Sequence, residues 1–89
     1  MKWQVFWSAV AGKDGQPAKI ESFRLEVEAE DVDDAIEKAN AKIATAPTPQ
    51  QFARLLDRKI VYLRNENGEI WRPKNDGIDW EEVKIDFAE

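Results

Sequence analysis

The stretch that decides the fold is KIESFRLEVEA, residues 19–29. Its apolar residues Phe23, Leu25, Val27 and Ala29 alternate with the polar residues Ser22, Arg24, Glu26 and Glu28. Successive side chains of a strand point to opposite faces, so this alternation predicts a strand with one face in the core and one in water. One-sided burial of this kind is typical of antiparallel sheets.

The preceding stretch, KWQVFWSAVA (residues 2–11), is predicted to pair with it as an antiparallel strand, because the turn formers GKDGQP (12–17) separate the two. One face of this strand, which we assign to the core, carries Trp3, Val5, Trp7 and Ala9. Phe6 and Val10 lie on the other face. If no helix covers that face, its aromatic side chains form an exposed patch.

Two helices are expected to follow. Asp31 is a plausible N-cap, and Asp33 and Asp34 fall in the first turn, where the positive end of the helix dipole favours carboxylates. Apolar residues then recur at helical spacing, at Val32, Ala35, Ile36, Ala39 and Ile43.

After the break at APTP, the stretch TPQQ (48–51) predicts a second, short helix. Thr48 would be its N-cap, Pro49 its first residue and Gln51 the end of a capping box. The apolar side of this helix would consist of Phe52, Leu55 and Leu56.

The stretch KIVYLRNENGEIWRP (59–73) predicts a hairpin around a two-residue type I′ turn at Asn67-Gly68. That register pairs Arg64 with Trp71. It turns Val61, Leu63 and Ile70 inward and places Tyr62, Arg64 and Trp71 on the reverse face. A last strand, EVKIDF (82–87), would turn Val83, Ile85 and Phe87 inward, with Trp80 on its lead-in.

The fold class predicted from these elements is α+β, in the order β-β-α-α-β-β-β. An antiparallel sheet of about five strands carries both helices on one face, in a single domain over residues 1–89. A hydrophobic content of 43% is enough for a core, so we do not expect disorder. The absence of an apolar run of about 20 residues and of a signal-peptide pattern leads us to expect a soluble, cytoplasmic protein without a membrane span.

The composition argues against catalysis. The chain has no cysteine and no histidine, which removes thiolate chemistry, the commonest metal ligand and the commonest base. The acids of EAEDVDD (28–34) are explained by the start of a helix, so we expect no enzyme activity, no metal and no cofactor.

The charge of the chain is segmented. Residues 75–89 hold six acids against Lys84, whereas residues 1–74 hold twelve acids and twelve bases. A second acidic stretch runs from Glu26 to Glu37, and a basic one covers residues 54–74. Trp80 lies between acids, as an interface anchor inside a polar rim would, although it could also cover an open sheet edge. Of Trp71 and Trp80, we expect Trp71 to be the more exposed.

The layout of residues 19–83 resembles that of many small phage-encoded proteins, some of which are anti-CRISPR inhibitors of host defence. A strand pair leads to VEAEDVDDAIEKA, and a tryptophan-bearing hairpin, LRNENGEIWRPKNDG, and a short acidic end follow. The resemblance carries no binding residue over to this chain. It implies a compact, non-catalytic protein that works by occupying a surface.

The leading functional prediction is a non-enzymatic protein-binding inhibitor or adaptor of this phage anti-defence type. It would use its acidic surface to engage a basic, nucleic-acid-binding groove of a protein partner. The predicted protein-binding residues are Glu26, Glu28, Asp33, Asp34, Trp71, Asp76, Asp79, Trp80, Glu81 and Glu82.

Two alternatives remain open. The basic hairpin 54–74, with Tyr62, Arg64, Trp71, Arg72 and Lys74, combines cations with stacking surfaces, as modules that bind single-stranded nucleic acid do. We do not expect direct nucleic-acid binding, because the acidic tail would repel phosphate. The second alternative is a structural component that self-associates as a homodimer through an exposed strand edge.

Overall fold

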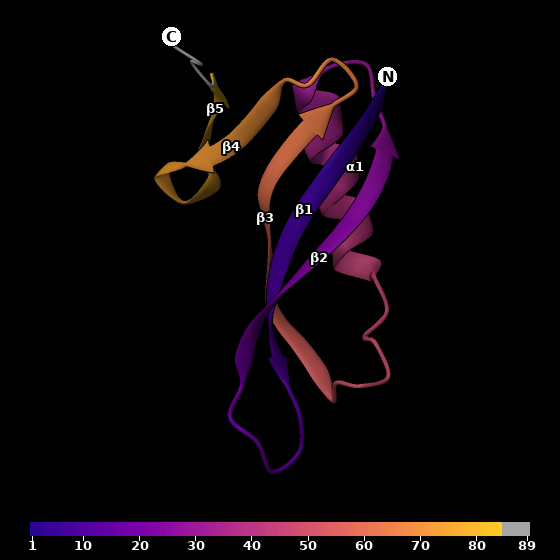
Figure 1. Ribbon diagram of the computed structural model, residues 1–89, viewed down its shortest axis with the longest axis vertical. Helices are drawn as coiled ribbons and strands as arrows, with labels where there is room; N and C mark the ends of the chain where they lie inside the picture. The colour runs from indigo at the N-terminus through magenta and orange to yellow at the C-terminus, as the bar shows by residue number, and fades with distance from the viewer. Residues whose placement is uncertain (85–89) are drawn as a thin grey trace, which may run out of the picture.

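A computed structural model describes residues 1–84 of the chain. The elements follow in the order β1 (Lys2–Gly12), β2 (Lys19–Glu28), α1 (Val32–Thr45), β3 (Arg54–Asn65), β4 (Ile70–Lys74), the 3₁₀ turn η1 (Asn75–Gly77) and β5 (Asp79–Val83). The strands form one antiparallel sheet in the order β2-β1-β3-β4-β5, and α1 packs on one face of β1, β2 and β3 (Figure 1). The α+β class and the five-stranded antiparallel sheet are confirmed.

The core lies between α1 and the first three strands. The alternating residues Trp3, Val5, Trp7 and Ala9 of β1 are buried, as is Val27 of β2, so the predicted inward face of this hairpin is correct. Ala35, Ala39 and Ile43 form the buried stripe of α1. Small alanine side chains let the helix approach the sheet closely.

Both ends of α1 are fixed by side chains. At the start, the Asp31 carboxylate accepts a hydrogen bond from the Asp34 amide at 2.8 Å, which makes Asp31 the N-cap as predicted. At the other end, the Arg58 guanidinium of β3 donates to the carbonyls of Ile43 at 2.8 Å and Ala46 at 2.6 Å. A cation there satisfies open carbonyls and the negative end of the helix dipole.

The prediction of a second helix after Thr48 is wrong, because the residues from Arg54 onward form the long strand β3. The local capping-box pattern at Thr48 is overridden by pairing with β1, which places Leu55 opposite Ala11 and buries it. Leu56, on the other face, is 54% exposed. The structure therefore has one α-helix within residues 1–84, besides the short 3₁₀ turn η1.

Two bulges in strand β3 interrupt the alternation of its buried and exposed residues. Its register against β1 shifts between Phe6 and Trp7 and again between Ser8 and Val10, where β3 carries extra residues. Val61 is one of these and is 45% exposed, contrary to the inward position predicted for it. Asp57 lies in the second irregular segment with φ of 52°. Bulges of this kind bring Leu55, Ile60 and Leu63 all into the core despite their uneven spacing.

The turn between β3 and β4 has one residue more than predicted. Asn65 donates its amide to the Glu69 carbonyl at 3.1 Å, and its buried side-chain oxygen accepts from the amides of Asn67 and Glu69. Gly68 supplies the positive φ that this three-residue loop requires. The pairing becomes Leu63 with Trp71 and Arg64 with Ile70, so Trp71 moves to the core face and Ile70 to the reverse face.

The last strand also differs from the expectation. It starts at Asp79, so Trp80 lies within β5 rather than before it, and Val83 pairs with Ile70 on the reverse face. The predicted inward positions of residues 85 and 87 lie outside the described residues.

Candidate protein-binding surface

Strands β4 and β5, with η1 between them, form a two-stranded arm (residues 70–83) that leaves the rest of the sheet (Figure 1). The two strands pair along their whole length, but β4 pairs with β3 only at Trp71 and Ile70. The main-chain N–H and C=O groups of alternate residues in a strand point to the same side. Because the carbonyl of Glu69 faces β3, the main-chain polar groups of Trp71 and Pro73 face β3 as well. Pro73 has no N–H to donate, and the pairing of β3 with β4 ends before it.

Both tryptophans of the arm point to the core face of the sheet. Trp71 lies opposite the buried Leu63, and Trp80 lies opposite Pro73, two residues further along the arm. Each is partly buried and packs against the core cluster. The core covers part of each indole ring, and the exposed part of the ring can contact a partner.

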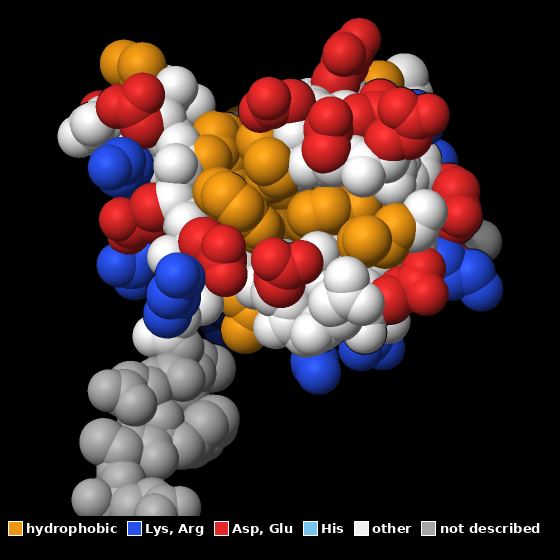
Figure 2. All heavy atoms as spheres, turned by 90° about the horizontal axis from the view of Figure 1, so that it is seen from above, with side chains coloured by type: hydrophobic (Ala, Val, Ile, Leu, Met, Phe, Trp, Pro, Cys, Tyr) orange, Lys and Arg blue, Asp and Glu red, His pale blue; other side chains and the backbone are white. Residues whose placement is uncertain are grey.

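Two residues from the first turns of α1, Val32 and Ile36, are also partly buried against the core. They lie at the same end of the molecule as Trp71, because the start of β1 pairs with both the end of β2 and the end of β3. Viewed from this end, apolar side chains are exposed between groups of acidic side chains (Figure 2). We call Val32, Ile36, Trp71 and Trp80 the tryptophan surface.

Carboxylates accompany the tryptophan surface. Glu82 lies opposite Trp71 on the core face of the arm. Asp33 and Asp34 stand in the first turn of α1. The Asp34 carboxylate accepts from the Glu30 amide at 3.1 Å and pairs with Lys38 at 3.2 Å, and these contacts lower its pKa below the usual 3.8. It stays negatively charged at neutral pH.

The remaining predicted acids lie elsewhere. Glu26 and Glu28 of β2 and Asp79 and Glu81 of β5 belong to the reverse face, by their register. Three of them are engaged. Glu81 pairs with Arg72 at 2.6 Å, Asp79 accepts from the Asn75 side chain at 2.9 Å, and Glu28 pairs with the N-terminal amine of Met1 at 3.5 Å. Asp76 lies in η1 with φ of 56°. Of the ten predicted residues, the fold gathers Trp71, Trp80, Glu82, Asp33 and Asp34 at one end of its core face.

The reverse face carries an aromatic pair that the sequence did not reveal. Phe6 and Tyr62 stack with ring centroids 4.2 Å apart, and Arg24 lies 6.0 Å from the Phe6 centroid. Both rings are half-buried, and α1 covers the other face (Figure 1). Placement of Phe6 on the second face was correct, but its contact with Tyr62 requires β1 to lie beside β3, which no local pattern shows.

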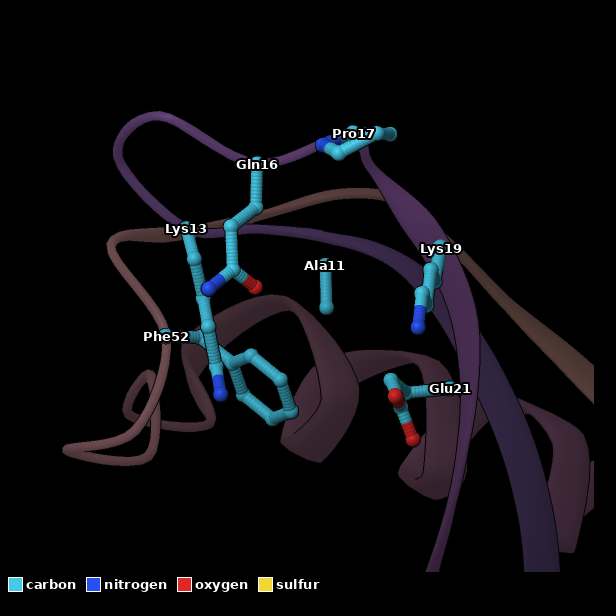
Figure 3. A pocket seen from close by; sticks show the side chains of 7 residues that line it. All are labelled: Ala11, Lys13, Gln16, Pro17, Lys19, Glu21 and Phe52. Carbon is cyan, nitrogen blue, oxygen red and sulfur yellow. The ribbon is translucent and has the colours of Figure 1, made fainter.

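A pocket at the opposite end of the molecule is too small for most ligands. It has a volume of about 90 Å³ and is lined by Ala11, Lys13, Gln16, Pro17, Lys19, Glu21 and Phe52 (Figure 3). Lys13 lies over the Phe52 ring at 5.8 Å. Sites for small molecules usually enclose roughly 300–1,000 Å³. We therefore assign this pocket to the packing of the β1–β2 loop against Phe52.

Comparison with protein-family models, with curated proteins and with solved structures finds no match to this chain. Within residues 1–84, no group of three or more acids comes together as a metal site. The α-helix within residues 1–84 is too short and too polar to cross a membrane.

Proposed function

We propose that this protein is a non-enzymatic inhibitor or adaptor that binds another protein through the tryptophan surface. The observation that carries the proposal is the arm, which holds Trp71, Trp80 and Glu82 on one side. Tryptophan is enriched among the residues that dominate binding energy, because it removes a large area from water with few rotatable bonds. Partly exposed indoles beside acids have the composition of such an anchor and its polar rim.

The charges favour a basic partner. Asp33, Asp34 and Glu82 accompany the apolar residues, and charges at a rim mainly accelerate association and select the partner. Because basic grooves commonly hold nucleic acid, a partner of this kind would lose that function when bound. A cytoplasmic, phage-derived anti-defence role remains our prediction for the biological setting.

The test uses tagged protein and two variants, Trp80→Ala and Glu82→Lys. The wild type should capture a specific basic protein, and binding should be reproduced with the purified pair by surface plasmon resonance. Trp80→Ala should mainly speed dissociation, and Glu82→Lys should mainly slow association and flatten its salt dependence. Ile78→Ala is the matched control, since Ile78 is apolar but 81% exposed in the turn of the arm.

Unfolding melts establish that each variant is folded. Capture that is equal for the wild type and both folded variants would refute the tryptophan surface. The Phe6–Tyr62 stack is the specific feature that favours nucleic acid instead. Binding of single-stranded DNA or RNA that Phe6→Ala abolishes and Trp80→Ala does not would replace the protein-binding proposal.

A further inference from the structure

The two edge strands of the sheet differ in whether side chains of α1 occupy their outward carbonyls. Strand β2 forms one edge, and two lysines of α1 reach over it. Lys38 donates to the carbonyl of Glu28 at 2.8 Å, and Lys42 donates to the carbonyl of Glu26 at 3.0 Å. These carbonyls are the acceptors that an added strand would need. The helix therefore occupies the outward carbonyls of the last residues of β2, Glu26 and Glu28.

The other edge, β5, offers its main chain outward. The carbonyl of Glu69 faces β3, so Ile70, Arg72 and Lys74 face β5, and their partners Val83, Glu81 and Asp79 face β4. The N–H and C=O groups of Trp80 and Glu82 consequently point away from the sheet. No strand within residues 1–84 pairs with them. An open edge of this kind is a template for pairing with another chain.

We propose that the partner adds a strand to β5, so that the sheet continues into the bound protein. This inference rests on the proposed function and specifies how the partner is held. The occupant is an extended, basic segment of a partner protein, because β5 contains Asp79, Glu81 and Glu82 and no base. Main-chain hydrogen bonds supply affinity in this mode, and alternate side chains supply specificity.

The register defines the side chains of the segment. Positions beside Trp80 and Glu82 fall on the core face, where apolar residues of the segment would cover the indole and the aliphatic part of Glu82. The opposite positions would meet Asp79 and Glu81. A segment that alternates apolar and basic residues places its apolar side chains on the core face and its basic side chains against Asp79 and Glu81 on the reverse face.

A second copy of this chain is a poor occupant of the same edge. Every two-fold antiparallel register centred on Trp80, Glu81 or Glu82 sets two carboxylates directly opposite each other. Like charges in that position destabilise a strand pair. In these three registers the acidic edge therefore disfavours its own copy and favours a basic strand.

The decisive variant is Glu82→Pro. Its ring removes the outward N–H of residue 82 but no hydrogen bond to β4, so the fold should survive. Glu82→Gln is the matched control, because it removes the charge and keeps the N–H. Glu81→Pro should lower the melting temperature clearly more than Glu82→Pro, since the N–H of Glu81 faces β4.

The probe is a fluorescein-labelled peptide of four Lys-Val repeats, with four Glu-Val repeats as its control, in fluorescence anisotropy. We expect the basic peptide to bind and the acidic one not to bind. Glu82→Pro should weaken binding at least tenfold, as loss of a main-chain bond and its geometry predicts, and Glu82→Gln about threefold or less. Amide exchange should slow at Trp80 and Glu82 in the complex.

Absence of binding, or equal binding by Glu82→Pro and Glu82→Gln, would overturn strand addition. So would a homodimer in sedimentation that Glu82→Pro dissociates. If a captured partner tolerates Glu82→Pro but not Trp80→Ala, strand addition is wrong and the tryptophan surface stands. If neither variant affects capture, the proposed function itself fails.

Discussion

Leu63→Ala tests the assignment of residues 54–65 to a strand. Leu63 has no exposed surface, and it lies between Val5 on β1 and Trp71 on β4. Truncation to alanine removes three carbons, worth about 2.4 kcal/mol at about 0.8 kcal/mol per buried methylene. Incomplete collapse of the cavity adds to this, so the free energy of unfolding should fall by about 3–4 kcal/mol.

Leu56→Ala is the matched control in the same strand. Leu56 is 54% exposed, so its truncation should cost less than about 1 kcal/mol. Urea titrations followed by tryptophan fluorescence measure both losses, with the slope m checked for constancy. A loss at Leu63 below about 1 kcal/mol, or a loss at Leu56 as large as that at Leu63, would refute the described face assignment of β3.

Two further predictions concern the ends of α1. Arg58→Met keeps the aliphatic stem but removes the hydrogen bonds to both helix carbonyls, so the free energy of unfolding in urea melts should fall by about 1–3 kcal/mol. The control Arg64→Met, on the reverse face, should lower it by less than about 0.5 kcal/mol. Equal losses in the two variants would contradict the capping role of Arg58. Asp34 has a lowered pKa in the folded state, so its ionised form stabilises the fold above its usual pKa of 3.8, and that contribution disappears as the pH falls through the lower folded value. Asp34→Asn should therefore lose less stability than the wild type between about pH 6 and about pH 3, and parallel losses would show that Asp34 is uninvolved.

Local patterns predicted the β1–β2 hairpin and α1 correctly because the sequence pattern of each segment favours only one type of secondary structure. The alternation in residues 19–29 and the cap at Asp31 depend on near neighbours, and tertiary contacts reinforce them. Strand β3 was misread because its bulges break the period of two, which leaves a proline-led capping pattern as the strongest local signal.

The candidate site was predictable in composition but not in geometry. The sequence identified Trp71, Trp80 and the acids, yet one buried side chain, Asn65, lengthens the turn and moves Trp71 to the other face. A register change of one residue reverses every side chain after it. The division of the acids between the two faces followed from that register and could not be read before the turn was known.

The lysine bonds over β2 have a consequence for growth of the sheet. A sheet that accepts strands at both edges can grow without limit, as fibrils do. Here the carbonyls of Glu26 and Glu28 are already occupied by Lys42 and Lys38, so the last residues of β2 cannot accept a further strand in the way that β5 can. A sheet extended at β5 should therefore not grow further from the end of β2 that lies beneath the start of α1.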